Sequence, residues 1–568
     1  MEVFKTITEG GQIWAHRIRM AKQVVKIAFF TSFMIGIVFF GFRMYQIPSL
    51  HYQALGYYVK AQLLTPLHET IEVNGKFWGD ASGSHSSKET VFLKPERIIK
   101  VCTPFISKLT DQAAHTLRAT FTIISYTFGI SLVFFLLRGL RARQKQHIDG
   151  KKLVSATKLA LKLILSRKAS PIKIGSLPLV KGTETQHILI SGATGSGKTN
   201  AYHHFLPQIR KERQRAVIVD TTGEYVEKYY RHGKDILLNP LDQRSAPWHP
   251  WCECDHSVDY KSLSQSFIPS SYREEENFWR KGAQEVFYSA LMELEQISST
   301  AALSKLLLHD PLSTLATVLK GTTATAYLDM SSEKTAGSVR AVASSFLECL
   351  DLLPDTATPF SIRDWVFKED SDSWLFLSCT PRQRASLIPL LSAWLSIGIS
   401  SLLQLPTNIN RRLWFVIDEL PRLHRLKDLE AFLTESRKFG GCGLFAIQSP
   451  AQLETLYGRD TTSTLLGNCA TRIAFAEHDP QIAYRISKGF GDKEMRESQE
   501  SLSYGAHEMR DGVSLSFQNR ISPLISSTAL QSLEIHEAYV KLPGNLPISK
   551  LKLDYRKIPK IAEPFVSI

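Results

Sequence analysis

Residues 187–199 read HILISGATGSGKT, and this stretch decides the fold. His187 to Ile190 is a short apolar run typical of a buried strand, and it leads directly into a glycine-rich loop. The loop fits the pattern G-x-x-x-x-G-K-[ST], in which the glycines let backbone N–H groups point at phosphate oxygens. The helix expected after it adds the positive end of its dipole. The sequence therefore predicts a nucleotide site built on a strand, a phosphate-binding loop and a helix.

The phosphate-binding loop predicts ATP and Mg²⁺ as ligands. Lys198 is expected to reach the β- and γ-phosphates, and the Thr199 hydroxyl to bind Mg²⁺. A glycine-rich turn without a ligand is the alternative, and the flanking strand and helix argue against it. The residues expected to hold the nucleotide are Gly192, Ala193, Thr194, Gly195, Ser196, Gly197, Lys198 and Thr199.

A second apolar run, LWFVI, ends in Asp418 and Glu419. A strand buried on both faces of a parallel sheet has this continuous apolar character, and ligands bind beyond the carboxyl ends of such strands. Asp418 is expected to hold Mg²⁺ through water, and Glu419 to orient and deprotonate the attacking water. Surface acids at a strand end are the alternative. The phosphate-binding loop upstream favours the catalytic interpretation.

Two further residues are candidates for the same reaction. Gln448 follows the next predicted strand, Gly443 to Ile447, where it would hydrogen-bond the γ-phosphate or the attacking water. A polar residue that merely ends the strand is the alternative. Arg437 lies on the predicted helix between these strands, far from its own site but able to reach that of a neighbouring subunit. It is the candidate arginine finger, and a solvated helix-surface arginine is the alternative.

Strand–helix units surround these motifs. Runs 215–220, 374–378 and 472–476 are typical of further strands. Repeated units of this kind predict a mostly parallel, doubly wound α/β sheet, which is the core of RecA-like P-loop ATPases. Residues 255–354 break the pattern, because apolar residues there recur at three- and four-residue spacing, which predicts an inserted all-α domain. The ATPase core is therefore expected at 171–254 and 355–568.

Two apolar runs, 24–42 and 119–137, are each long enough to cross a bilayer. Buried core helices, or a cleaved signal sequence for the first run, are the alternatives. Apolar character on every face and the lack of a small-residue cleavage site argue against them. Basic residues concentrate before the first run and after the second, which predicts a cytoplasmic N-terminus at 1–23, an external loop at 43–118 and a cytoplasmic remainder.

The positive charge gathers around these apolar runs. Residues 1–152 hold 20 basic and 9 acidic residues, so most of the net charge of +14 lies there and is weak evidence for DNA binding by the rest. A basic juxtamembrane segment follows at 138–170. Within it, residues 151–168 carry six basic residues and no acid, interleaved with Leu, Val and Ile. This pattern favours an interfacial helix held by anionic lipid, with a surface facing nucleic acid as the alternative.

The seven cysteines are scattered, which indicates reduced thiols and not a disulfide framework. Cys252 and Cys254 stand close to His256, but a zinc site usually needs a second ligand pair, so ordinary thiols are favoured over zinc.

The joint pattern resembles the coupling proteins of bacterial type IV secretion, the TraD/TraG-like conjugative family, and its TraD branch most. The resemblance extends from the first apolar run to the C-terminus. The motifs that carry it are SGATGSGKT (191–199), VDTTGEY (219–225), NPLD (239–242) with WHPW (248–251), DELP (418–421), ESRKFGG (435–441), AIQSPAQL (446–453) and AYVKLPG (538–544).

The resemblance implies a homo-hexameric ring with a central channel and an ATP at each subunit boundary, set in the inner membrane of a Gram-negative cell with the loop 43–118 in the periplasm. It implies a DNA translocase that binds a relaxase on transferred single-stranded DNA and contacts the secretion channel. The chain lacks the long acidic tail with which some members contact the relaxosome, so cargo selection stays open. Two alternatives are a coupling ATPase that recruits protein effectors, and a nucleotide-dependent membrane receptor or scaffold that does not pump.

Overall fold

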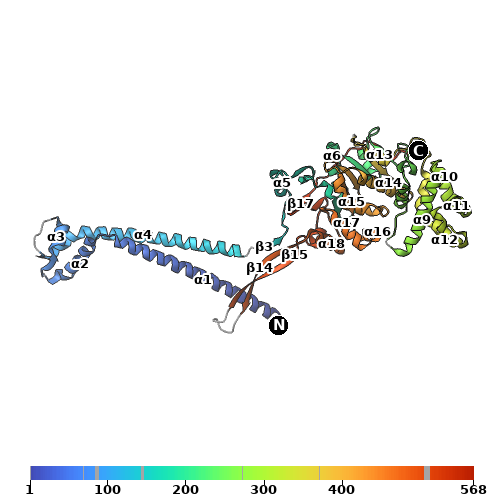
Figure 1. The fold of residues 1–568 in the computed structure, drawn as a ribbon. Helices are drawn as coiled ribbons and strands as arrows, with labels where there is room; N and C mark the ends of the chain where they lie inside the picture. The colour runs from blue at the N-terminus through green and yellow to red at the C-terminus, as the bar shows by residue number, and fades with distance from the viewer. Residues whose placement is uncertain are drawn as a thin grey trace. The chain divides into compact units, whose positions relative to one another are not determined.

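The computed structural model describes residues 2–67, 69–83, 89–142, 146–271, 273–369, 371–503 and 512–568. The chain divides into two compact units. The first comprises residues 1–146 and 497–518, and the second residues 147–496 and 519–568. Figure 1 shows the helices and strands of the chain. Each unit has its own hydrophobic core.

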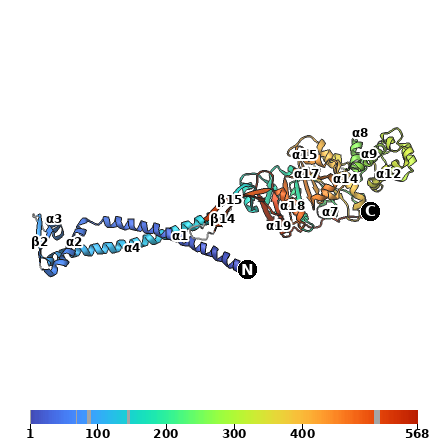
Figure 2. The same cartoon turned by 90° about the horizontal axis from the view of Figure 1, so that it is seen from below.

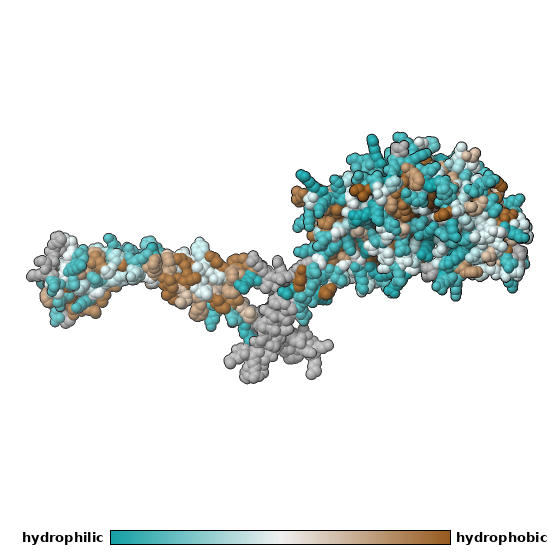
Figure 3. All heavy atoms as spheres, in the orientation of Figure 1, coloured by the Kyte–Doolittle hydropathy of each residue, from teal (hydrophilic) through white to brown (hydrophobic). Residues whose placement is uncertain are grey.

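The first unit is built on two long helices, α1 (Glu2–Tyr45) and α4 (Pro95–Ala142). Residues 18–45 and 95–138 within them are long and apolar enough to cross a membrane. Figure 3 shows apolar surface along this pair of helices. An isolated helix can span lipid because all its backbone hydrogen bonds lie within the segment.

Close packing of α1 against α4 depends on a glycine. A Cβ built on Gly36 would lie 2.5 Å from Ile124 Cγ1, so the Ile124 side chain packs directly against the backbone of α1 at Gly36. Small residues at such crossings let helix backbones approach closely in membranes.

The segment between the two long helices forms a small folded layer. Its core gathers eight buried side chains, including Trp78 and Cys102. Strands β1 and β2 pair antiparallel. The predicted periplasmic position of this segment stays a prediction. The elements are α2 (Ser49–Leu64), β1 (Ile71–Asn74), α3 (Gly75–Ser82) and β2 (Thr90–Leu93).

The second unit is organised around a ten-stranded sheet with the order β4-β17-β16-β13-β7-β12-β11-β8-β10-β9. From β13 to β9 all neighbours are parallel, whereas β16 pairs antiparallel with β13 and β17. The predicted α/β fold with a mostly parallel sheet is confirmed. The strands are β4 (Leu153–Ser155), β7 (Ile188–Ser191), β8 (Arg215–Asp220), β9 (Ile236–Leu238), β10 (Trp374–Ser378), β11 (Leu413–Ile417), β12 (Gly441–Ile447), β13 (Thr471–Ala474), β16 (Glu537–Lys541) and β17 (Ile548–Lys552).

Side chains of the central strands alternate between two hydrophobic cores. On β11, Phe415 and Ile417 join one core and Trp414 and Val416 join the other. Because both faces are covered, the strand is apolar throughout, as its sequence predicts. The helices α6 (Lys198–Lys211) and α7 (Glu224–Tyr229) cover one face, and α14 (Arg384–Gln404) covers the other.

Helix α14 has the length and composition of a membrane span, but 78% of its apolar window is buried inside this unit. It is therefore a core helix of the second unit.

Every element described between residues 255 and 360 is helical. These helices gather at one end of the second unit in both views (Figures 1 and 2), and their apolar side chains continue the core that covers the sheet. The predicted limits of the inserted domain, 255–354, stay a prediction. The principal helices are α8 (Ser257–Phe267), α9 (Glu274–Glu293), α10 (Thr300–Ser304), α11 (Leu312–Val318) and α12 (Glu333–Leu347).

The structure contains two further small sheets. One has the order β15-β14-β3, and the other is the antiparallel pair β5-β6. No cysteine is in a disulfide, and the described part of the chain has no group of three or more His, Cys, Asp or Glu that could hold a metal ion by itself. The remaining elements are β3 (Gln146–Gly150), α5 (Ala156–Leu165), β5 (Ala169–Ile174), β6 (Leu177–Val180), α13 (Ile362–Phe367), α15 (Leu429–Glu435), α16 (Pro450–Tyr457), α17 (Arg459–Asn468), α18 (Pro480–Phe490), β14 (Asp492–Ser503), β15 (Gly512–Pro523) and α19 (Ser527–Gln531).

Candidate nucleotide-binding site

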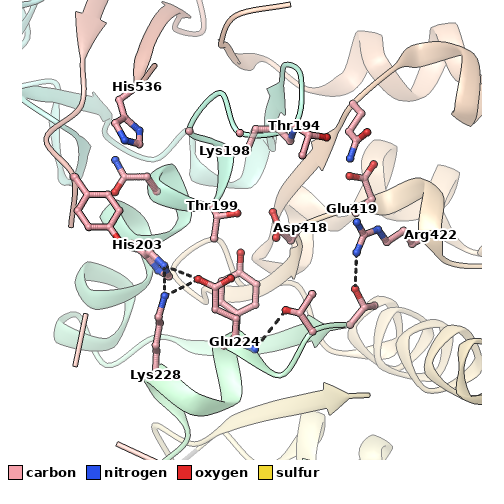
Figure 4. A pocket seen from close by; sticks show the side chains of 18 residues that line it. Thr194, Lys198, Thr199, His203, Glu224, Lys228, Asp418, Glu419, Arg422 and His536 are labelled. Atoms are coloured by element: carbon pink, nitrogen blue, oxygen red, sulfur yellow. Dashed lines mark hydrogen bonds and ion pairs between the residues drawn. The ribbon is translucent and has the colours of Figure 1, made fainter. Parts of the chain in front are cut away.

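The carboxyl ends of four adjacent parallel strands meet at one edge of the sheet. The strands are β7, β12, β11 and β8, in that spatial order. β7 leads into the glycine-rich loop, β12 into Gln448, β11 into Asp418 and β8 into Thr221. Because parallel strands end at the same edge, the segments that follow them lie together. They line a cavity of about 370 Å³ (Figure 4).

The glycine-rich loop needs its glycines for conformation and for space. Gly192, Gly195 and Gly197 have φ of +149°, +78° and +118°, which side chains rarely allow. A Cβ on Gly192 would lie 2.8 Å from Phe475 Cβ, and one on Gly197 would lie 2.7 Å from His536 Nδ1. The backbone is therefore free to face the cavity, and α6 begins at once with Lys198.

Lys198 is held across the loop. Its Nζ donates hydrogen bonds to the carbonyl oxygens of Gly192, at 2.8 Å, and Ala193, at 2.9 Å. Burial lowers the pKa of the ammonium group, while Glu419 and Asp418 oppose that shift. The lysine thus brings a positive charge to the same cavity as the two carboxylates.

Asp418 and Glu419 are carboxylates with raised pKa values. Burial raises the pKa of Asp418 to about 6, and the neighbouring Glu419 adds to the rise. Burial also raises the pKa of Glu419, against the opposing charge of Lys198. Glu419 Oε1 is buried and has no hydrogen-bond partner within the described ranges. An oxygen of this kind is ready to accept a proton or a hydrogen bond from a bound water.

Tyr202 ties the helix of the loop to the catalytic strand. Its buried hydroxyl donates a hydrogen bond of 2.8 Å to the carbonyl oxygen of Ile417, the residue before Asp418. The hydrogen bond links the N-terminal half of α6 to the end of β11, next to the two carboxylates.

Some of the residues predicted from the sequence line the cavity, and others lie outside it. Gln448 lines the cavity and faces Glu419, whose pKa its amide groups lower against the larger effect of burial. Arg437 is exposed on a short 3-10 turn, Ser436–Phe439, and does not line this cavity. The loop residues among the lining are Thr194, Gly195, Gly197, Lys198 and Thr199, and those outside it are Gly192, Ala193 and Ser196. The roles assigned to all of them stay predictions.

Arg422 is a second cation that the sequence analysis does not identify. It follows the Asp-Glu-Leu-Pro motif and lines the cavity. Its Nη1 donates a hydrogen bond of 3.3 Å to Thr221 Oγ1, and Figure 4 shows the guanidinium group beside Glu419. Arg422 therefore adds a positive group to that of Lys198 for the charge of a triphosphate.

A charged network from α6 and α7 lines another wall. Glu224 Oε1 accepts a hydrogen bond of 2.6 Å from Lys228 Nζ and lies 3.2 Å from His203 Nε2. His203, and after it Lys228, hold the pKa of Glu224 at about 2, so its charge is fixed at neutral pH. The sequence analysis assigns no role to Glu224. Its position in the VDTTGEY motif, just after the predicted strand 215–220, is the sequence feature that could have indicated one.

The residues of the cavity fit a nucleoside triphosphate with Mg²⁺. The glycine cradle, the helix N-terminus and Lys198 suit phosphate oxygens. Mg²⁺ takes few protein ligands and keeps several waters, which agrees with one carboxylate, Asp418, and one hydroxyl, Thr199.

Affinity for Mg²⁺ is expected to depend on pH, because the metal binds the ionised carboxylate and the pKa of Asp418 is about 6. A proton competes with the metal below that pH and not above it. The Mg²⁺-dependent part of the ADP affinity should fall about tenfold per pH unit on the acid side and level off at neutral pH. Calorimetric titration with and without Mg²⁺ measures this, and Asp418→Asn should abolish the dependence. A flat profile in the unaltered protein would contradict the assignment.

Comparison with known proteins gives one consistent result. The family described as type IV secretion-system coupling protein DNA-binding domain matches residues 171–554. The coupling protein TraD of Escherichia coli strain K12 is 33% identical over 574 residues, which cover 99% of this chain and 79% of that protein. The conjugal transfer protein TraG of Agrobacterium fabrum is 34% identical over 145 residues, 25% of this chain and 21% of that protein.

Solved structures agree with these sequence matches. The bacterial conjugative coupling protein TrwBdeltaN70 superposes with a TM-score of 0.67 and 27% identity, covering 74% of this chain and 98% of that chain. The plasmid coupling protein TrwB in complex with ADP and Mg²⁺ gives a TM-score of 0.67 and 26% identity, covering 75% and 98%.

Proposed function

Because this chain belongs to the type IV secretion-system coupling protein family, we propose that it is an inner-membrane ATPase that delivers DNA to a conjugative secretion channel. The observation that carries the proposal is the convergence of the glycine-rich loop with Asp418 and Glu419 around one cavity. The relative TrwB, solved with ADP and Mg²⁺, supports the choice of ligands.

The proposed partners follow from the family. They are single-stranded transfer DNA bound to its relaxase, components of the secretion channel, the membrane, and further copies of this chain in a hexameric ring. The exposed position of Arg437, outside its own cavity, supports a ring in which one subunit completes the site of the next.

The residues predicted to act on the nucleotide have distinct tasks in hydrolysis. Backbone N–H groups of the loop and the Lys198 ammonium bind the β- and γ-phosphates, and Arg422 adds positive charge on the far side of Glu419. Thr199 and Asp418 would hold Mg²⁺, which would supply charge neutralisation at the phosphates. Gln448 orients the attacking water.

Glu419 is the general base. Its raised pKa suits a group that must take a proton from water, and among the residues that the structure describes its Oε1 has no hydrogen-bond partner to compete for that proton. Lys198 opposes the rise in the pKa of Glu419 and so favours its ionised form.

ATP hydrolysis by the full chain in detergent, with single-stranded or double-stranded DNA, tests the proposal. Single-stranded DNA should stimulate turnover, and the stimulation should fall steeply with salt because phosphate contacts release counterions. Intact basal hydrolysis without stimulation by either DNA would contradict the proposal that the cargo is DNA and would favour protein effectors as the cargo. Absence of hydrolysis would overturn the motor and favour a scaffold.

A further inference from the structure

Helix α5 presents two chemically different faces. Ala156, Leu159, Ala160 and Leu163 are buried in the core beneath the sheet. On the opposite side Leu161, Ile164 and Leu165 are 57%, 58% and 75% exposed. Figure 3 shows apolar surface at the edge of the second unit where Figure 1 places α5. A helix that served only its own core would not expose three large aliphatic side chains within two turns.

Basic side chains surround this aliphatic cluster. Lys158 lies three residues before Leu161, and Lys162 lies three residues before Leu165, so each lysine neighbours the aliphatic cluster on the helix surface. Arg167 and Lys168 follow the helix directly, and all four basic residues are exposed. None of these four forms an ion pair with any residue that the structure describes. From Gly150 to Thr183 the sequence contains eight basic and no acidic residues.

The covalent connection limits how far this face can lie from the end of α4. Helix α4 ends at Ala142 and α5 begins at Ala156. An extended chain covers at most about 3.5 Å per residue, so the link limits the separation to about 50 Å. The cytoplasmic leaflet, which is rich in anionic lipid, lies within that reach if α4 spans the bilayer.

The amino-acid composition of residues 150–183 favours a lipid over a nucleic acid as the ligand of this face. Surfaces that bind single-stranded nucleic acid stack bases on aromatic rings. Residues 150–183 contain no aromatic side chain, and the centre of the basic face is aliphatic. Aliphatic side chains ringed by Lys and Arg are instead the pattern of a helix that lies in the membrane interface.

We propose that the outer face of α5 binds an anionic phospholipid surface. Leu161, Ile164 and Leu165 enter the boundary between headgroups and acyl chains, and the basic residues around them bind lipid phosphates. This contact holds the second unit against the membrane and is independent of ATP hydrolysis.

Fluorescence of the full chain in nanodiscs tests the proposal. An environment-sensitive dye is attached to Leu165→Cys, and the unaltered protein gives the background from its native thiols. Val258→Cys on α8, which is 74% exposed, is the matched control site. In nanodiscs rich in phosphatidylglycerol, quenching of the Leu165 dye by brominated acyl chains should exceed that of the Val258 dye at least about threefold. In pure phosphatidylcholine the difference should shrink.

A charge variant identifies the source of the lipid preference. Combined replacement of Lys158, Lys162, Arg167 and Lys168 by Gln should remove the dependence of quenching on phosphatidylglycerol. Basal ATP hydrolysis and the thermal unfolding temperature should stay unchanged, and these two measurements show that the variant is folded. Equal quenching at the two sites would overturn the proposal. A Leu165 dye that responds to single-stranded DNA, or only to oligomer formation, would also overturn it, in favour of a nucleic acid or a second copy of the chain.

Discussion

Glu419→Gln is expected to lower ATP turnover by about 10²–10⁴-fold while ATP affinity changes little. The carboxamide has nearly the shape of the carboxylate but cannot take a proton from water. Glu419 is half-buried near Lys198 and Arg422, and its Oε1, which has no hydrogen-bond partner among the described residues, is a basic oxygen that an amide oxygen cannot replace. Nucleotide binding depends on the loop, which the substitution does not touch.

Steady-state hydrolysis and equilibrium binding of a fluorescent ATP analogue measure the two effects separately. Glu430→Gln is the matched control, because Glu430 is an exposed carboxylate of α15 outside the cavity. It should keep full turnover. Retained turnover in the Glu419 variant would move the general base to another residue, and loss of binding would show that Glu419 helps to hold the metal.

The same variant tests the coupling to transport. A motor that hydrolyses ATP to move DNA should lose conjugative transfer together with turnover, even though the protein still binds nucleotide and reaches the membrane. Transfer that survives the loss of turnover would favour a receptor or scaffold over a motor.

Local sequence patterns predict the strands that carry the candidate site well. The strand before the loop, the strand before Asp418 and the strand before Gln448 all form as β7, β11 and β12. Each is a run of buried apolar residues with a motif at its end, so the hydrophobic pattern alone locates it. The parallel arrangement also follows, because long helical connections exclude hairpins.

Contacts between distant segments are harder to predict. Arg422 meets Thr221 only because β11 lies next to β8, and no local pattern specifies that neighbour. Strand β14 reads DKEMRESQESLS, which has too little apolar alternation to signal a strand. The antiparallel strands β16 and β17 extend the sheet beyond β13, although their sequences do not indicate direction or partner.

Lys198→Ala should abolish both hydrolysis and tight nucleotide binding, and this separates it from the Glu419 variant. A charge-assisted hydrogen bond contributes about 1.5–3 kcal/mol, so the loss of contacts to two phosphates should weaken ATP binding by about 10²–10³-fold or more. The other two cations that line the cavity are already engaged, since Arg422 donates a hydrogen bond to Thr221 Oγ1 and Lys228 donates one to Glu224 Oε1.

Binding of the same ATP analogue to Lys198→Ala checks this expectation, with Lys211→Ala as the matched control. Lys211 is exposed at the far end of the same helix, so its loss should leave binding and turnover intact. Thermal unfolding without nucleotide shows whether the altered loop still folds, since the ammonium also bonds the carbonyls of Gly192 and Ala193. A folded Lys198→Ala protein that binds ATP as tightly as the unaltered chain would place the phosphates elsewhere, and the carboxylates at Asp418 and Glu419 would then have no substrate to act on.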